Sequence, residues 1–431
     1  MKPKFTRILI GITFLSVNSF VFAQCPQICD GNYNTALGNS TLLYNSGFGN
    51  TVVGQYAFSG GNGNNNVAVG SYAASGYTVN PPVTDNVAIG FAALNADQGS
   101  RNTAVGSSAL LYAWGSDNTA TGYQALYTDD VGSGNTADGE YSLFNNTSGV
   151  NNTACGLSAL QGMAGSATGS YNTASGALAL QSNSSGSNNT AVGYEALHSN
   201  SFGSENTAIG YLALSAYGGD AATATGFEAL MNNSTGFGNT ADGFQSLLSN
   251  TIGGANTATG SGALTLNTTG NSNTATGYDA LLNNTSGSSN TAYGHYALVN
   301  NIGGGNIAVG DSAGANLTTG SNNIDIGNVG VAGESNKIRI GTKGSQNTTF
   351  IAGISGTTVS GGVAVIVGTQ GKLGTINSSE RFKRNIHPMD KASEAILALK
   401  PVTFLYKHEL DPAEIPQFGL VAEQVEKINP N

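Results

Sequence analysis

The sequence predicts an all-β fold of the solenoid class, in which short coils stack into a rod. The phrase Asn-Thr-Ala-x-Gly-x-x-Ala-Leu returns along the chain, mostly at steps of 16 or 17 residues. Asn102–Leu110 and Asn189–Leu197 are two clean copies. One such unit is too short to bury its own apolar face, so it must stack on its neighbours. The spacing is also short for helices, and Gly, Asn, Ser and Thr disfavour helix interiors.

Each copy begins at an anchor position that is almost always asparagine. Within a copy, Thr-Ala-x alternates, which places Ala on one face of a strand and Thr and x on the other. Position x varies between Val105, Asp138 and Tyr293, so the pattern leaves open which face points inward. The anchors, with Ala222 replacing asparagine in one copy, are Asn34, Asn50, Asn66, Asn86, Asn102, Asn118, Asn135, Asn152, Asn172, Asn189, Asn206, Asn239, Asn256, Asn273, Asn290, Asn306 and Asn323.

The Ala-Leu pair supplies the one regularly large apolar side chain of each copy. Two short strands per coil fit the length, and about 18 coils spaced at ~4.8 Å give a rod on the order of 85 Å long. Turn-forming runs such as Asn183–Asn188 separate the copies. We expect the leucines to stack as a column at one corner, at Leu94, Leu110, Leu126, Leu143, Leu160, Leu180, Leu197, Leu214, Leu230, Leu247, Leu264, Leu281 and Leu298.

An interior made of alanines and one leucine per coil buries little apolar area per residue. We therefore expect the slender roll to gain stability by self-association, and we predict an oligomer. The strand face that carries Thr and x is the natural candidate for a partner surface.

Charge changes abruptly along the chain. Between Gln24 and Asn336 the one basic residue is Arg101, against 17 acidic residues, whereas Lys and Arg return from Lys337 onward. An acidic rod has no basic patch for phosphate backbones, so we expect no nucleic-acid partner. The same acidity disfavours adsorption to anionic membrane surfaces.

Residues 1–23 have the features of a secretory signal peptide. Lys2 and Arg7 lie in a basic start, residues 8–15 form an apolar core, and Val21-Phe22-Ala23 offers small residues to a signal peptidase. The apolar run is too short for a membrane span, so we expect none in the mature chain. These features predict an exported protein, extracellular or at the cell surface.

Cysteine and histidine show no metal-binding pattern. Cys25 and Cys29 are close enough to pair in an oxidising compartment, and Cys155 occupies the x position of a repeat. The histidines are scattered without ligand-like spacing, at His198, His295, His387 and His408. We assign no metal site and no cofactor.

The repeats resemble the head repeats of trimeric autotransporter adhesins, the YadA-like family. Asn86–Gly90 (NVAIG), Asn102–Gly106 (NTAVG) and Asn206–Gly210 (NTAIG) carry the resemblance, which extends over about three quarters of the mature chain. It implies a left-handed parallel β-roll that assembles as a homotrimer. The period here is slightly longer than in that family, and the recurrent Ala-Leu is a departure from it.

The C-terminal segment resembles a second family, the endosialidase-type intramolecular chaperones of phage tail fibres and tail spikes. Three blocks carry the resemblance, Ser378–Ile386, Leu399–Lys407 and Gly419–Glu426. That family promotes trimerisation of the protein it terminates and then cuts itself off. The family domain normally continues beyond the point where this sequence stops, so we expect an incomplete domain.

The family's start motif, Ser-Asp-x-Arg-x-Lys, is matched by Ser378, Arg381 and Lys383, with Ser379 replacing the Asp. The resemblance implies a Ser-Lys dyad in which Ser378 is the nucleophile and Lys383 the base, and a cut between Asn377 and Ser378. A serine hydroxyl needs a base, and a desolvated lysine can serve as one. The alternative is that Ser378 or Asn377 caps a short helix and that Lys383 is solvated.

Three further surface patterns invite functional interpretations. Irregularly spaced carboxylates, among them Asp138, Glu140, Glu195, Glu228, Asp242 and Asp279, suggest a glycosidase pair or, more simply, a solvated face. Threonine pairs at Thr119/Thr121, Thr257/Thr259 and Thr274/Thr276 suggest an ice-binding array. Aromatic residues share one register and suggest either a sugar-stacking ladder or packing between protomers, at Tyr123, Tyr194, Tyr211, Phe227, Phe244 and Tyr278.

Five segments are therefore predicted: a signal peptide at 1–23, a lead-in at 24–33, the β-roll at 34–341, a β-rich neck at 342–376 and a small α+β chaperone domain at 377–431. A short helix is expected at Ala392–Leu399. The leading interpretation is an exported homotrimeric fibre or adhesin-like surface protein with a self-cleaving chaperone tail. Its partners would be its own copies and a host surface glycan or matrix protein. The alternatives are a phage-derived polysaccharide depolymerase and an ice-binding solenoid.

Overall fold

The computed structural model describes most of the repeat region and several parts of the C-terminal segment. The chain divides into two compact units, Met1–Thr348 and Thr349–Asn431. The signal peptide predicted at 1–23 and the cysteines Cys25 and Cys29 lie outside the described residues. The described residues are 32–42, 47–60, 62–76, 82–96, 99–112, 114–163, 167–352, 365–375, 384–388, 393–405, 407–408 and 416–428.

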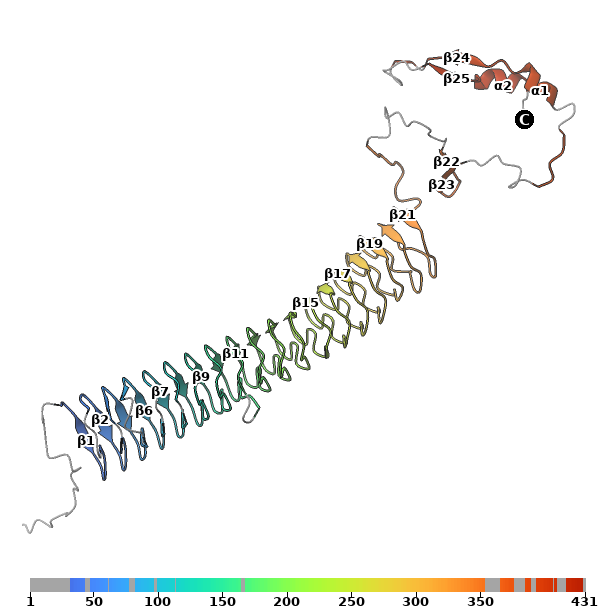
Figure 1. Ribbon diagram of the computed structural model, residues 1–431. Helices are drawn as coiled ribbons and strands as arrows, with labels where there is room; N and C mark the ends of the chain where they lie inside the picture. The colour runs from blue at the N-terminus through green and yellow to red at the C-terminus, as the bar shows by residue number, and fades with distance from the viewer. Residues whose placement is uncertain are drawn as a thin grey trace, which may run out of the picture. The chain divides into compact units, whose positions relative to one another are not determined.

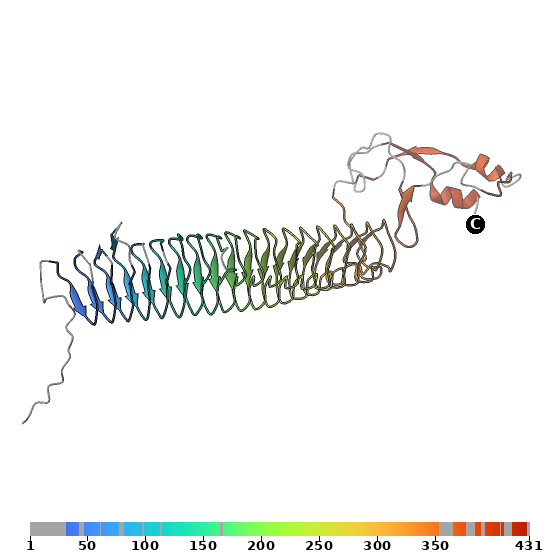
Figure 2. The ribbon, with the colours of Figure 1, turned by 60° about the horizontal axis from the view of Figure 1, so that its bottom comes forward.

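The first unit is a row of coils joined through one parallel sheet, which confirms the predicted all-β solenoid (Figure 1). Each of the 19 strands pairs in register with the strands of the coils before and after it, except the end strands β1 and β21, which have one neighbour each (Figure 2). The strands are β1 (Thr35–Leu37), β2 (Thr51–Val53), β4 (Val67–Val69), β6 (Val87–Ile89), β7 (Thr103–Val105), β8 (Thr119–Thr121), β9 (Thr136–Asp138), β10 (Thr153–Cys155), β11 (Thr173–Ser175), β12 (Thr190–Val192), β13 (Thr207–Ile209), β14 (Thr223–Thr225), β15 (Thr240–Asp242), β16 (Thr257–Thr259), β17 (Thr274–Thr276), β18 (Thr291–Tyr293), β19 (Ile307–Val309), β20 (Ile324–Ile326) and β21 (Ile338–Ile340). A separate short parallel pair is formed by β3 (Gly63–Asn64) and β5 (Val83–Thr84).

The strands show which face of the Thr-Ala-x phrase points inward. In β16 the central Ala258 is fully buried, whereas Thr257 and Thr259 are exposed. The same pattern recurs along the rod, because the in-register pairing places alanine beside alanine from coil to coil. Alanine is small enough for the opposite wall of a narrow coil to approach closely. Side-chain size therefore explains why the alanine face points inward, which the sequence pattern had left open.

The corner of each coil is built from residues with left-handed backbone conformation rather than from a second strand. Gly122, Gln124 and Leu126 have φ values of 132°, 52° and 50°. The Leu126 N–H donates to Ser142 O of the following coil at 2.9 Å, and the Gln124 N–H donates to Ser107 O of the preceding coil at 3.0 Å. The expectation of two strands per coil was therefore wrong, since alternate left-handed residues interrupt an extended backbone while both neighbours still receive hydrogen bonds.

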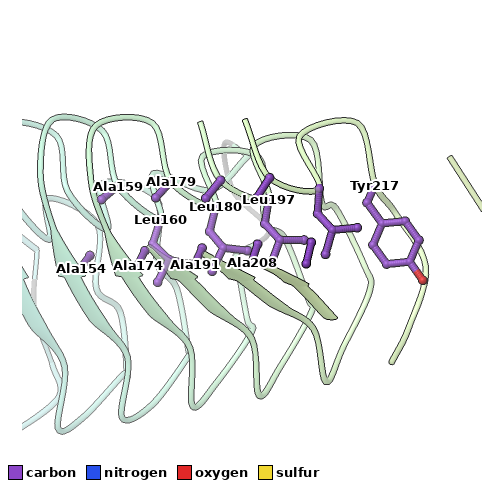
Figure 3. Packing of buried hydrophobic residues seen from close by; sticks show 14 of the residues in the cluster. Ala154, Ala159, Leu160, Ala174, Ala179, Leu180, Ala191, Leu197, Ala208 and Tyr217 are labelled. Carbon is purple, nitrogen blue, oxygen red and sulfur yellow. The ribbon is translucent and has the colours of Figure 1, made fainter. Parts of the chain in front are cut away.

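The predicted leucine column forms the core with the alanines. Leu160, Leu180 and Leu197 stack from coil to coil beside the buried alanines (Figure 3). The left-handed conformation costs a leucine about 1–2 kcal/mol. Burial of its side chain contributes about 2 kcal/mol and offsets that cost. The core is narrow but closed within a single chain, as its leucines are at most 3% exposed.

The anchor asparagines form a buried hydrogen-bonded column that the sequence pattern did not reveal. Asn256 accepts from the backbone N–H of Asn273 at 3.0 Å, and its Nδ2 donates to Gly270 O of the following coil at 2.8 Å. Asn273 Nδ2 also donates to Asn256 Oδ1 at 3.1 Å. Each side chain thus replaces water for two backbone groups of the next coil, which would be costly to bury without a partner.

A second buried asparagine column lies three residues after the leucines. Asn250 Nδ2 donates to Asn233 Oδ1 and Asn267 Nδ2 donates to Asn250 Oδ1, both at 2.7 Å. Each of these side chains also donates to the carbonyl of the glycine three residues later, as Asn250 does to Gly253 at 2.8 Å. Tyr217 occupies this position in another coil, where burial raises its pKa to about 12. Its hydroxyl donates to Asp220 O at 2.8 Å.

Ala222 interrupts the anchor column, so restoring asparagine there is expected to stabilise the rod. Because residue 222 has no side-chain oxygen, Asn239 Nδ2 donates to Gly236 O, three residues earlier in the chain, at 3.1 Å. Ala222→Asn would provide Oδ1 for Asn239 and Nδ2 for Gly236, and we expect the free energy of unfolding to rise by about 1–2 kcal/mol. Thermal unfolding would measure the change. Ala216→Asn is the matched control, since residue 216 is exposed, and an equal gain there would contradict the assignment.

The second unit has secondary structure but no buried residue among those described. Two antiparallel pairs are formed by β22 (Val365–Val367) with β23 (Leu373–Thr375) and by β24 (Val402–Phe404) with β25 (Gln417–Gly419). Two helices, α1 (Glu394–Ala398) and α2 (Ala422–Ile428), also lack buried residues. Phe350, Leu397 and Phe418 are 85–92% exposed. A lone two-stranded pair is marginal in water, so the described parts of this unit lack the apolar burial that would stabilise them.

Candidate functional site

A stack of aromatic side chains runs along the outside of the rod at the position after the repeat glycine. Neighbouring ring centroids in the series Tyr194, Tyr211, Phe227 and Phe244 are 5.5, 5.1 and 5.3 Å apart, and the ring planes are tilted by only 10–14°. These rings are 41–51% exposed. The solenoid creates the stack because the coil repeat places one register position above the next.

The geometry of this stack determines what it can bind. Nearly parallel rings with centroids about 5 Å apart are offset-stacked, so each inner ring covers much of its neighbour's face. Sugars stack on free aromatic faces, and Tyr211 and Phe227 offer mainly their edges. The stack therefore favours packing of the rings on one another, with a free edge for contact with another surface, over a row of sugar-stacking platforms.

The six aromatic residues predicted to share one ladder do not form one. Tyr123 packs edge to face on Tyr141 at 5.5 Å, and Tyr278 stacks on His295 at 5.5 Å. The continuity is lost because the intervening coils carry other residues at this register, such as Ala177 and Ser261. The register was read correctly from the sequence, but a ladder needs aromatic residues in consecutive coils.

A second aromatic cluster was missed in the sequence. Tyr127 stacks on Phe144 with centroids 4.9 Å apart, Tyr112 packs edge to face on Tyr127 at 5.6 Å, and Tyr141 contacts Phe144 at 5.6 Å. Trp114, nearby in the chain, is 58% exposed. The sequence did contain a signal for this cluster: the residue directly after the repeat leucine is aromatic in two consecutive coils, at Tyr127 and Phe144.

The threonines of the strands form a long outward column, but paired threonines do not form an extended array. Thr257/Thr259 and Thr274/Thr276 are in register in the neighbouring strands β16 and β17. The next strand on one side carries Tyr293 at the second position and the next on the other side carries Asp242. A regular lattice would need many consecutive pairs, so the geometry gives the ice-binding alternative no support.

The exposed strand carboxylates do not approach one another as a glycosidase pair. Asp138 and Asp242 lie in β9 and β15, six coils apart, which is about 29 Å at the ~4.8 Å spacing of strands. Paired catalytic carboxylates lie about 5–9.5 Å apart. The depolymerase alternative therefore receives no support from these two residues.

Two other acids are buried in the core. Asp129 occupies the second asparagine column, and its Oδ1 accepts from Asn146 Nδ2 at 2.8 Å. Its Oδ2 has no hydrogen-bond partner among the described residues. Burial raises the pKa of Asp129 to about 8 against the weaker lowering effect of the Asn146 hydrogen bond. The carboxyl group is thus held in its neutral form, in which it resembles the asparagines above it.

Asp325 and Arg339 end the alanine column at the C-terminal coils of the rod. They are in register as the central residues of β20 and β21. Burial raises the pKa of Asp325 to about 6. Arg339 Nε donates to Glu334 Oε1 at 2.7 Å, and this hydrogen bond lowers the pKa of Glu334. Polar side chains here close the core toward solvent, as terminal repeats of solenoids do.

The predicted dyad of Ser378 and Lys383 lies outside the described residues, as does Asn377. The structure does describe the segments that follow. Two of the sequence blocks noted above meet in space, because β24 and β25 pair with Val402 opposite Gly419. Helix α1 lies within the predicted Ala392–Leu399 segment, and α2 follows β25 directly.

Residues 378–431 match the chaperone of endosialidase family, Peptidase_S74. The chain carries a chaperone-of-endosialidase domain. This match covers the C-terminal segment, whereas the β-solenoid body is supported by the structure itself. No curated protein matches the chain. Chaperone domains of this family are associated with trimeric assembly.

The described residues contain neither a metal-binding cluster nor a membrane-spanning helix. No group of three or more His, Cys, Asp or Glu side chains is arranged to hold a metal ion there. In that same part of the chain, no helix has both the length and the apolar composition needed to cross a membrane. Cys155 is a free, exposed thiol at the x position of β10.

Proposed function

We propose that the chain is an exported, homotrimeric β-solenoid fibre with an adhesin-like role, assembled by its C-terminal chaperone domain, which then cuts itself off. The observation that carries the proposal is the contrast between the two units. The solenoid buries a column of repeat leucines and alanines within one chain, whereas the second unit buries none of its described residues. We infer that the second unit buries its apolar residues against other copies of the chain. This agrees with the association of chaperone-of-endosialidase domains with trimeric assembly.

The proposed cut uses the serine and lysine of the family motif. The neutral Lys383 amine takes the proton of Ser378 Oγ, and Oγ attacks the carbonyl carbon of Asn377. The Asn377–Ser378 amide bond breaks as an ester forms, and the lysine returns the proton to the leaving α-amino group of Ser378. Water then hydrolyses the ester, leaving a carboxylate on Asn377. Desolvation between copies would keep Lys383 neutral, which couples the cut to assembly.

Replacement of Ser378 by alanine is expected to abolish this cut while leaving the trimer intact. Intact mass spectrometry of the secreted full chain should show a product that ends at Asn377, and Ser378→Ala and Lys383→Ala should each retain the full mass. Ser379→Ala is the control and should still be cut. Light scattering coupled to size exclusion should give a trimer for all four proteins. Cleavage in Ser378→Ala would refute the dyad, and a monomer at every concentration would refute the trimeric fibre.

The adhesive role belongs to the rod. Its exposed aromatic residues offer apolar edges beside a threonine-rich, acidic surface. We propose that this surface contacts a host glycan or matrix protein, with the rod as a spacer that holds the contact away from the cell. Binding of the purified trimer to arrays of glycans and matrix proteins distinguishes this role from that of an inert stalk.

A further inference from the structure

The outward face of the sheet changes composition abruptly at the C-terminal end of the rod. From β7 to β18 the first residue of every strand is threonine. In β19, β20 and β21 both outward positions are aliphatic, as Ile307 and Val309, Ile324 and Ile326, and Ile338 and Ile340. Threonine already satisfies the preference of strands for β-branched residues. The strand conformation therefore does not require isoleucine here, and the change from threonine adds exposed apolar surface.

These six side chains form one contiguous patch, which we call the aliphatic face. Parallel pairing places Ile307, Ile324 and Ile338 in one column and Val309, Ile326 and Ile340 in the next. Exposure is greatest in the last strand, at 70% for Ile338 and 74% for Ile340, against 39% for Ile307. Contiguous apolar surface of this kind marks an interaction site more often than scattered exposed residues do.

Two strands near the N-terminal end of the rod, β4 and β6, also carry only valine and isoleucine outward, but these side chains are at most 40% exposed. The middle of the sheet, from β9 to β15, is poorly suited to packing against copies of itself. The column that holds Val309 and Ile340 holds Asp138 and Asp242 further back along the rod. In a symmetric assembly packed through this face, equivalent carboxylates of neighbouring copies would approach one another and repel. The aliphatic face has no charged side chain in either outward column, so copies can meet there without that penalty.

We propose that the aliphatic face is where copies of this chain pack against one another, so that self-association of the rod is confined to its C-terminal coils. This proposal rests on the trimer of the proposed function and assigns a surface to it. The second unit begins at Thr349, within ten residues of Ile340 along the chain, and none of its described residues is buried. A domain that gathers copies would bring the coils next to it together first. The threonine-rich coils are then left free along the rod.

The test introduces two aspartates on the aliphatic face and, as a control, two aspartates at the same two columns of a threonine-bearing strand. The variant is Ile338→Asp with Ile340→Asp in the full chain. The control is Thr257→Asp with Thr259→Asp, which occupies the same two columns in β16, where both threonines are exposed. Sedimentation is measured over a wide range of concentrations, and circular dichroism checks the fold. We expect the concentration for half-dissociation to rise at least a hundredfold in the variant and to stay within a few-fold of the native value in the control.

A second measurement keeps the proposal testable if the double aspartate variant does not fold. In a chain whose three cysteines are replaced by serine, Ile340→Cys should give disulfide-linked copies on oxidation, and Thr259→Cys should not. If the native chain is oligomeric but Ile338→Asp with Ile340→Asp associates as tightly as it does, the aliphatic face is not the contact and the proposed function stands. A native chain that stays monomeric would instead overturn the proposed function.

Discussion

Replacing Gly243 by alanine is expected to disrupt the solenoid at that coil and to lower its free energy of unfolding by about 4 kcal/mol. Gly243 has a φ of 140°, which side-chain-bearing residues rarely adopt, and an added Cβ would lie 2.5 Å from Gly260 O and 2.6 Å from its carbonyl carbon. These are backbone atoms of the next coil, so the clash cannot be relieved by rotating a side chain. Denaturant unfolding and amide hydrogen exchange of the neighbouring coils would measure the loss.

Gly218 provides the control for this substitution. An added Cβ at Gly218 would meet no atom within 4 Å. Gly218→Ala should therefore change stability by less than about 0.5 kcal/mol. An equal loss of stability in the two variants would show that the close approach of the coils does not require glycine at position 243.

Replacing Asp129 by asparagine is expected to remove a pH dependence of stability. The folded-state pKa of about 8 lies above the unfolded value of 3.8. The folded chain therefore binds more protons than the unfolded chain between these two values. The stability contributed by the neutral carboxyl group is fully present below about pH 4, and it is lost as pH rises to about 8. The loss amounts to a few kcal/mol. Asp129→Asn keeps the Asn146 contact without the proton.

The measurement is the thermal midpoint at pH 5 and at pH 8.5. We expect the native midpoint to fall over this interval and the midpoint of Asp129→Asn to fall much less. Asp130→Asn removes the same charge from an exposed neighbour and serves as the control. If the native and Asp129→Asn chains lose stability in parallel with rising pH, burial of the Asp129 carboxyl group does not control the response.

The repeat alone was sufficient to predict the coil stack and its leucine column. The period forces stacking, and one large apolar residue per coil has to face inward, so Leu160 and Leu180 were identified without a structure. The inward face of the strand was not predictable in the same way. Ala258 and its flanking threonines are all small, and the close approach of the opposite wall decides between them.

The corner conformation and the buried polar columns could not be predicted for a different reason. Leu126 carries none of the local signals of a left-handed residue, because its conformation is imposed by hydrogen bonds to the next coil. Asp129 looks like one acid among turn residues. Its position three residues after Leu126, the spacing that Asn233 and Asn250 have from their own leucines, was the signal available. The proposed dyad at Ser378 and Lys383 stays a prediction.

The polar columns described above also make the reach of the molecule adjustable. A coil with both asparagines offers the same carbonyls and amides to the following coil as it receives from the preceding one, as Asn256 does between Asn239 and Asn273. Duplicating or deleting one 17-residue coil, such as Asn256–Ser272, reproduces every junction it touches. Unequal recombination between near-identical repeats can therefore lengthen or shorten the rod in single steps of about 4.8 Å, without changing the residues at either end.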